Sequence, residues 1–278
     1  MQVGNSFAKR LTDVMATPIG AVWVRMAFSG VVLLLIALVR YIAARLVNRG
    51  TARPVVPKAK DAWRYAIAYG AALIAMNTMF YEAIATVPVG IVITIEFLGP
   101  LAVAILGSRR PSDFVWVGLA AAGVVLLGVT PTHLNLIGVA LALGAGTMWA
   151  CYILLGAKVA GRWQGNGVLT GTCVAGAIIL TPFFLLGGNA ASLTPSNSAL
   201  GLVVALACTV LPYSLELAAL GRLPTGLFAI LESLAPAVGA VSAWLVLGQG
   251  LHYLDWVAIG CVVAASLGAT TAQARART

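Results

Sequence analysis

Long apolar runs, separated by short segments that carry most of the charge, dominate this chain of 278 residues. Crossing a bilayer takes about 20 apolar residues in a helix, and backbone groups in hydrocarbon must be paired internally, so such runs form helices. A membrane β-barrel would alternate polar and apolar residues, and this chain does not. Charged residues make up 9% of it, against about 25% in a typical soluble domain. The sequence therefore predicts an all-α integral membrane protein.

Ten segments are expected to be transmembrane helices, with boundaries near 1–16, 19–40, 63–83, 88–107, 112–130, 136–157, 166–187, 198–219, 225–247 and 253–272. Basic residues cluster in every second connection and at the C-terminus, whereas the connections between these contain no Lys or Arg. Because cytoplasmic loops are enriched in Lys and Arg, we expect a multi-pass protein with both termini cytoplasmic. The net charge of +9 is then explained by topology, and no nucleic-acid partner is expected.

Two stretches of the chain repeat one pattern. Residues 88–100 read PVGIVITIEFLGP and residues 224–236 read PTGLFAILESLAP, so a shift of 136 positions superposes two prolines, a glycine and a glutamate. We infer an internal duplication, with the first copy in residues 1–132 and the second in residues 133–278. Each copy would hold five helices, an odd number, so the second would be inverted in the membrane. Inverted repeats of transporters place the binding site near the bilayer midplane.

Each copy places a glutamate four positions before a proline, as Glu96 and Pro100 and as Glu232 and Pro236. The two side chains lie one turn apart on one helix face, and because proline has no N–H, the glutamate carbonyl loses its helical partner. A carboxyl group inside the membrane usually faces a cavity or a partner, where it can carry a proton or bind a substrate ammonium. Alternatively, each carboxyl group bonds to backbone and locks two helices together. We predict substrate and proton binding at Glu96 and Glu232, and helix breaks at Pro100 and Pro236.

Other polar residues also lie within predicted spans. Glu216 has Phe80 as its counterpart in the first copy, and it either contributes to specificity or coupling or pairs with Arg222. Arg25 either pairs with a glutamate or neutralises a substrate carboxylate. Glu82 lies near the outer end of its span, where an interfacial role competes. The remaining candidates for lining a central cavity are Asn77, Tyr81, Tyr152 and Tyr213.

Motifs of enzymes and of metal sites are absent from the sequence. The chain has no P-loop and no HExxH motif, and no GxSxG nucleophile elbow. Its four cysteines form no CxxC pair, and we interpret them as packing residues. Gly138, Ala142, Gly146 and Ala150 fall on one helix face and predict close helix packing. We therefore expect no enzyme activity, no cofactor and no metal, and transport energy would come from an ion gradient.

Residues 77–104, NTMFYEAIATVPVGIVITIEFLGPLAVA, resemble the central signature of the EamA-type drug/metabolite transporter superfamily. Within it, they are most similar to the bacterial inner-membrane threonine/homoserine exporters. GAGTMWACYILLG (144–156), LPYSLELAAL (211–220) and LESLAPAV (231–238) match the same group. The resemblance implies a bacterial inner-membrane protein with ten helices in two inverted five-helix repeats. The family's first helix usually begins about a dozen residues earlier, so we expect a shortened first helix.

The resemblance also implies export of small amino acids or related metabolites, coupled to a proton gradient. We predict a secondary exporter working by alternating access, in which the glutamates bind a proton and the substrate ammonium in competition. Its expected partners are a small-molecule substrate, protons and membrane lipid, and nothing in the sequence indicates the oligomeric state. Two alternatives stay open: broad-spectrum efflux of drugs or metabolites, and a non-transporting membrane enzyme or scaffold.

Overall fold

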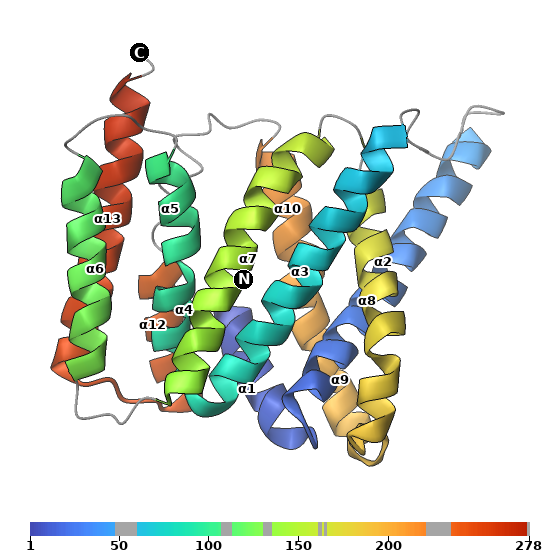
Figure 1. Ribbon diagram of the computed structural model, residues 1–278. Helices are drawn as coiled ribbons and strands as arrows, with labels where there is room; N and C mark the ends of the chain where they lie inside the picture. The colour runs from blue at the N-terminus through green and yellow to red at the C-terminus, as the bar shows by residue number, and fades with distance from the viewer. Residues whose placement is uncertain are drawn as a thin grey trace.

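The computed structural model of the chain describes residues 1–47, 60–106, 113–129, 135–160, 163, 166–220 and 235–276. Most of these residues are helical, and none of them forms a β-strand. The helices are α1 (Gln2–Val14), α2 (Pro18–Val47), α3 (Lys60–Thr86), α4 (Val89–Glu96), α5 (Leu98–Leu106), α6 (Asp113–Val129), α7 (Leu136–Ala160), α8 (Gly167–Leu186), η1 (Asn189–Ser192), α9 (Pro195–Ala205), η2 (Leu206–Val210), α10 (Leu211–Leu220), α12 (Ala235–Leu247) and α13 (Tyr253–Ala276). They run roughly side by side, with α5 continuing the course of α4 and α10 that of α9, and the other connections lie mostly at two opposite ends (Figure 1).

The predicted all-α membrane architecture is confirmed. Among the described residues, five helical stretches are long and apolar enough to cross a membrane: Pro18–Ala43, Ala62–Thr86, Leu136–Gly156, Gly167–Leu186 and Pro195–Glu216. The same part of the chain holds three shorter apolar stretches: Val89–Val103, Ala235–Leu247 and Tyr253–Gly268. Residues 221–234, which hold Glu232 and the first part of the predicted ninth span, lie outside the described residues. The arrangement as ten helices in two inverted repeats stays a prediction.

The predicted fourth span is broken in its middle. Helix α4 ends on Glu96, Phe97 follows as a turn, and α5 begins at Leu98. Pro100, in the first turn of α5, has no N–H to donate to the Glu96 carbonyl. The break therefore falls where the spacing of glutamate and proline predicts it.

The predicted eighth span is irregular as well, which was not predicted. It runs from α9 through one π-helical turn, η2, into α10. At its end the Leu211 N–H bonds to the carbonyl of Leu206, one residue further back than in an α-helix. Single π-helical turns of this kind are frequent at functional sites, so η2 marks a second irregular point within the bundle.

Helix α1 is short but packs inside the bundle, against α12, α9 and α3. Six of its residues are buried, and these include the polar residues Asn5, Ser6 and Thr12. Its 13 residues rise by about 20 Å, which is less than the hydrocarbon core of about 30 Å. Arg10 donates from Nη2 to the carbonyl of Val246 at the end of α12, so a basic residue of α1 completes the C-terminus of its neighbour.

Small residues of α7 allow close contact with α3 and α4. A Cβ atom added to Gly146 would lie 2.6 Å from the carbonyl oxygen of Glu96, and one added to Gly138 would lie 2.6 Å from Thr86 Oγ1. A Cβ atom on Gly99 would overlap the carbonyl of Gly146. The predicted close packing along this stripe is confirmed at Gly138 and Gly146, and it holds the α4–α5 break against α7.

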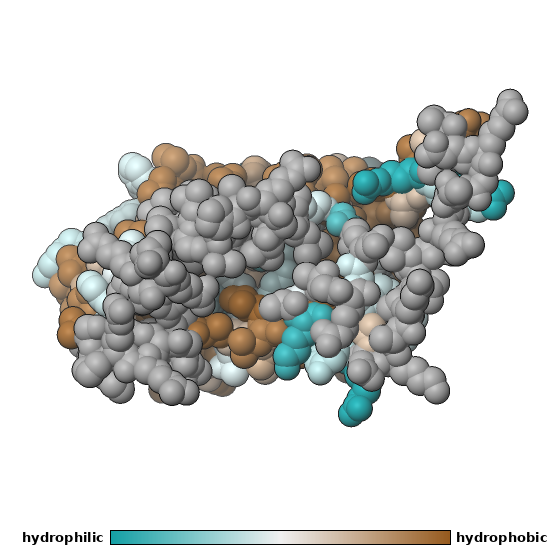
Figure 2. Space-filling model, turned by 90° about the horizontal axis from the view of Figure 1, so that it is seen from above, coloured by the Kyte–Doolittle hydropathy of each residue, from teal (hydrophilic) through white to brown (hydrophobic). Residues whose placement is uncertain are grey.

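The flanks of the bundle are apolar. Seen from the end at which α2 and α13 finish, hydrophilic side chains project at the end while apolar side chains form much of the flank (Figure 2). The largely exposed apolar side chains include Leu35, Leu154, Ile178 and Phe183. Such exposure would be costly in water and is suited to contact with lipid.

Candidate functional site

Arg25 of α2 lies in the interior of the bundle with only 1% of its surface exposed. A charged side chain at the centre of a membrane costs about 2.5–3.5 kcal/mol on insertion scales, so its surroundings need to compensate for that cost. The ring centroid of Tyr81, from α3, lies 5.7 Å from Cζ of the guanidinium. Its hydrogen-bond acceptors are Thr209 and Cys208 of η2. Three segments far apart in the sequence therefore meet at Arg25.

Two hydrogen bonds tie Arg25 to η2. Its Nε donates to Thr209 Oγ1 at 2.8 Å, and its Nη2 donates to the carbonyl oxygen of Cys208 at 2.9 Å. In a regular α-helix the Cys208 carbonyl would accept from residue 212, but Pro212 has no N–H. Arg25 thus supplies the donor that the proline removes. Both bonds use the same edge of the guanidinium, and its Nη1 group makes no hydrogen bond to a described residue.

Two tyrosine hydroxyl groups near Arg25 are buried without a partner. Tyr81 and Tyr213 are 0% and 2% exposed, and neither hydroxyl oxygen has a partner with full hydrogen-bond geometry among the described residues, although the hydroxyl of Tyr81 lies beside the guanidinium of Arg25. Both side chains are near enough to Arg25 for electrostatic interaction with its charge. An unsatisfied buried polar group costs about 1–3 kcal/mol. Such groups in native proteins are usually explained by an ordered water, an ion or a ligand.

Glu96 brings a carboxyl group into the same interior. It is 4% exposed and is the last residue of α4. Its carboxyl group lies within range of a direct charge interaction with Arg25, yet the two do not approach within the 4.0 Å of an ion pair. The interior therefore holds a guanidinium and a carboxyl group that lie near each other but form no ion pair.

A tyrosine cluster, Tyr69 of α3, Tyr152 of α7 and Tyr213 of α10, continues the polar region from Arg25. Ring centroids are 4.8 Å apart between Tyr69 and Tyr152, and 5.8 Å apart between Tyr152 and Tyr213. Glu216 lies close enough to all three for electrostatic interaction. Of the residues chosen from the sequence, Tyr152, Tyr213 and Glu216 are thus brought together, and Tyr213 connects them to Arg25.

The remaining sequence candidates are placed less centrally or are not described. Asn77 is buried, but its amide nitrogen donates to the carbonyl of Leu73 within its own helix, at 2.7 Å. Pro236 is buried at the second described position of α12. Glu232 lies outside the described residues. The side chain of Glu82 is half-buried.

Sequence reasoning missed Thr209, Cys208 and Tyr69 as members of this cluster. One signal was available for Cys208, because it precedes Pro212 by four positions, the spacing that also identified Glu96 and Pro100. Tyr69 begins an i, i+4 row on α3 that continues through Leu73 and Asn77 to Tyr81, and rows of this kind form one ridge of a helix surface. No pattern in the sequence indicated that Arg25 contacts η2.

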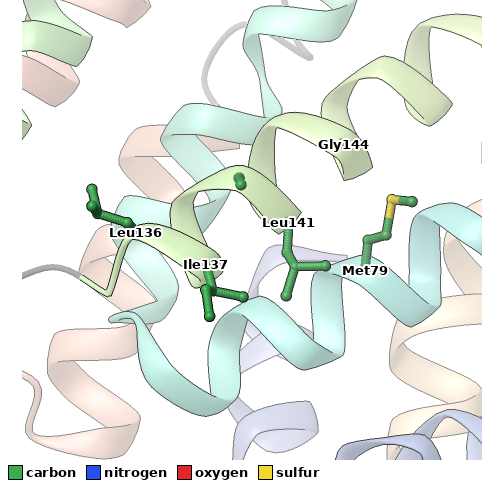
Figure 3. A pocket seen from close by; sticks show the side chains of 6 residues that line it. Met79, Leu136, Ile137, Leu141 and Gly144 are labelled. Atoms are coloured by element: carbon green, nitrogen blue, oxygen red, sulfur yellow. The ribbon is translucent and has the colours of Figure 1, made fainter.

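A shallow groove of about 380 Å³ on the surface contains none of these residues. It is lined by Met79 of α3 and by Leu136, Ile137, Ala140, Leu141 and Gly144 of α7 (Figure 3). We interpret it as part of the lipid-facing flank, because all of its lining side chains are apolar. Within the described ranges, no three His, Cys, Asp or Glu side chains are grouped so that they could hold a metal ion. The buried cluster around Arg25 is therefore the candidate site.

Residues 136–271 match the EamA-like transporter family. The chain is 47% identical to the threonine/homoserine exporter RhtA of Escherichia coli K12 over 205 residues, which are 73% of this chain and 69% of the exporter. It is 41% identical to the threonine/homoserine exporter RhtA of Salmonella typhimurium SL1344 over 273 residues, which are 97% of this chain and 87% of the exporter. A solved crystal structure aligns with 98% of the chain and 97% of its own length, with a TM-score of 0.58 at 20% identity, a likeness of fold alone.

Proposed function

Because this chain belongs to the EamA-like transporter family, we propose that it is a secondary exporter of small amino acids, with threonine and homoserine as the first substrates to test. Relatives that are 41–47% identical to it are named threonine/homoserine exporters. These relatives favour export of amino acids over broad-spectrum efflux, and transport over an enzymatic or scaffolding role.

The buried guanidinium of Arg25 and the buried carboxyl group of Glu96 carry this proposal. A free amino acid at neutral pH holds a carboxylate and an ammonium a few ångströms apart. A site that keeps a guanidinium and a carboxyl group near each other, without an ion pair between them, complements both ends of such a zwitterion. An apolar drug would gain nothing from either charge and would leave both desolvated.

The carboxyl groups are proposed to couple export to protons. Glu96 would hold the substrate ammonium in one state and a proton in the other, so that the two compete for it. Its burial beside the break at Pro100 supports this, since helix breaks at membrane depth are tolerated mainly where they line a cavity or are buried in protein. We propose the same role for Glu232, the repeat-related glutamate. Asn77, Tyr81, Tyr152, Tyr213 and Glu216 would shape the cavity.

Alternating access between two inverted repeats, residues 1–132 and 133–278, completes the proposal. The helix contacts support it: α2 packs on α8 and α6 on α13, while α3 packs on α7 as α1 does on α9. In the proposed duplication α1, α2, α3 and α6 correspond to α7, α8, α9 and α13. Exchanging the two copies therefore leaves the α2–α8 and α6–α13 contacts unchanged and converts the α3–α7 contact into the α1–α9 contact. Helices α2, α7 and α13 end on one side (Figure 1), with Arg45 and Lys158 in the last turns of the first two. This supports cytoplasmic termini in a bacterial inner membrane.

Uptake of labelled threonine and homoserine into proteoliposomes, with and without an imposed pH gradient, tests the function. We expect accumulation that depends on the gradient and that is absent from protein-free liposomes. Folded protein that moves neither amino acid nor any other small zwitterion would refute amino-acid export. A lipophilic dye assayed in parallel identifies broad-spectrum efflux, and uptake that ignores the pH gradient would remove the proton from the mechanism.

A further inference from the structure

We propose that Arg25, together with the hydroxyl groups of Tyr81 and Tyr213, binds the carboxylate of the exported amino acid. This inference rests on the proposed function and adds one requirement to it, that a substrate must carry a free carboxylate. Glu96 would then receive the ammonium end. The subsite is built from α2, α3 and α10, at the point where η2 interrupts the eighth span.

The guanidinium of Arg25 has one edge left for a ligand. The Nε and Nη2 groups that bond to Thr209 and Cys208 form its lateral edge. The Nη1 group and the second hydrogen of Nη2 form the other edge, and they bond to no described residue. Two parallel N–H groups at this spacing match the two oxygens of a carboxylate, which arginine binds in bidentate fashion.

The hydroxyl groups of Tyr81 and Tyr213 supply two further donors. A carboxylate offers about four lone-pair positions, which two N–H groups and two O–H groups would fill. Both hydroxyls are shielded from solvent and are without a described partner. Both side chains interact with the charge of Arg25, so they lie around the group that would receive the anion.

A purely structural role for Arg25 and the two tyrosines does not account for the second edge of the guanidinium or for the two hydroxyl groups. The bonds to Thr209 and Cys208 already complete the helix, and they use only one edge of Arg25. Several other buried polar side chains of the spans are paired, within their own helix or with a neighbouring one. Thr94, for example, donates to the carbonyl of Gly90 at 2.7 Å. Phenylalanine would pack in place of either tyrosine without a buried, unpaired hydroxyl, so the hydroxyls point to a ligand.

Analogues without the carboxylate test the requirement directly. In proteoliposomes that exchange labelled threonine, the competitors would be unlabelled threonine, threonine amide and 1-amino-2-propanol. The last two keep the amino and hydroxyl groups of threonine but carry no carboxylate. We expect each to compete at least a hundredfold more weakly than threonine. Competition within threefold of threonine would overturn the inference while leaving amino-acid export intact.

The variants Tyr81→Phe and Tyr213→Phe test the residues. Each removes one donor to a charged group, so we expect the KM for threonine to rise by about tenfold to a hundredfold. Inhibition by 1-amino-2-propanol should not change, because this compound has no carboxylate to accept a hydrogen bond from the lost hydroxyl. Since neither hydroxyl has a described partner, thermal stability in detergent should equal or exceed that of the unmodified protein. The control is Tyr41→Phe, at an exposed position of α2, with an unchanged KM.

The outcomes separate the two proposals. Unmodified protein that moves no amino acid would refute the proposed function, and the carboxylate subsite would fall with it. Threonine transport with an unchanged KM in both phenylalanine variants would refute the subsite alone. Arg25→Lys keeps the charge but not the bidentate edge, and should raise the KM by more than either tyrosine variant. If the Arg25→Lys protein does not fold, the KM values of the two tyrosine variants still test the carboxylate subsite.

Discussion

The Nη2 group of Arg25 donates to the carbonyl oxygen of Cys208, 2.9 Å away, where Pro212 removes the donor that a helix would provide. A charged side chain of α2 thus stands in for a backbone N–H of α10. The bond fixes α2 to η2 at membrane depth, where water cannot satisfy a carbonyl. It also orients the guanidinium so that its second edge points away from the backbone it holds. One residue thereby serves both the irregular helix and the proposed carboxylate site.

A double-mutant cycle tests whether the Arg25 side chain replaces the backbone N–H that Pro212 lacks. Arg25→Met removes both hydrogen bonds, and we expect it to lower the free energy of unfolding by about 2–4 kcal/mol, because two buried acceptors lose their partners. Pro212→Ala restores an N–H at residue 212. In the Arg25→Met background it should recover about 1 kcal/mol or more, while in the unmodified protein it should gain little.

Reversible unfolding of the four proteins in mixed detergent measures the coupling between the two positions. Mutations at independent sites add within about 0.5 kcal/mol. Strict additivity of Arg25→Met and Pro212→Ala would therefore mean that the Cys208 carbonyl does not depend on Arg25. Thr209→Val serves as the matched control, because it removes the bond from Nε but leaves the Cys208 carbonyl paired. Its effect should not depend on residue 212.

Neutral replacement of the buried carboxyl group is expected to stop coupled transport. Glu96→Gln keeps the size of the side chain but can neither take up a proton nor hold an ammonium by charge. We expect the loss of at least 95% of the gradient-driven threonine uptake, on the order of 2 kcal/mol of lost stabilisation or more, with an unchanged elution profile of the purified protein.

Glu82→Gln provides the comparison for Glu96→Gln, because Glu82 is also a glutamate within an apolar span but is only half-buried. It should keep most of the uptake. Glu232→Gln should behave like Glu96→Gln if the repeat carries function in both copies. Normal gradient-driven uptake by both Glu96→Gln and Glu232→Gln would move the coupling site elsewhere.

The sequence was sufficient for the class of fold and for the break at Glu96, and insufficient for how the site is assembled. Hydrophobic runs specify helices because hydrocarbon leaves the backbone no other partner, and a proline identifies the carbonyl it frees. Which group then donates a hydrogen bond to that carbonyl depends on tertiary packing. Arg25 and Cys208 are 183 positions apart, and no local pattern connects them. The amide of Asn77 is a second example, because its bond to the carbonyl of Leu73 in its own helix is visible only in the structure.

Close packing at the α4–α5 break is expected to be sensitive to a single methyl group. Gly146→Ala would place a Cβ atom 2.6 Å from the carbonyl oxygen of Glu96, and neither backbone can move freely. We expect a loss of about 1–3 kcal/mol, as for other overpacked positions, together with reduced transport because Glu96 shifts. The control Gly171→Ala adds the same methyl group on α8, where nothing lies within 4 Å. It should be neutral or slightly stabilising, and equal melting of both variants would contradict the close contact.

Asn189, after α8, is expected to be the most costly asparagine to remove. It is fully buried, its Oδ1 accepts from the N–H of Thr17 at 3.0 Å, and its Nδ2 donates to Thr17 Oγ1 at 2.9 Å and to the carbonyl of Phe184 at 3.2 Å. It thereby joins the start of α2 to the end of α8, across 172 positions of sequence.

Asn189→Ala should destabilise the protein by about 2–4 kcal/mol, because three hydrogen bonds of a fully buried side chain are lost at once. Thermal unfolding in detergent measures the effect. Asn197→Ala is the control, since its side chain makes one bond, to the carbonyl of Ser192, in a half-buried position, and its loss should cost about 1 kcal/mol or less. If the two variants melted at the same temperature, water would have to replace the partners of Asn189, and the junction between α2 and α8 would not depend on it.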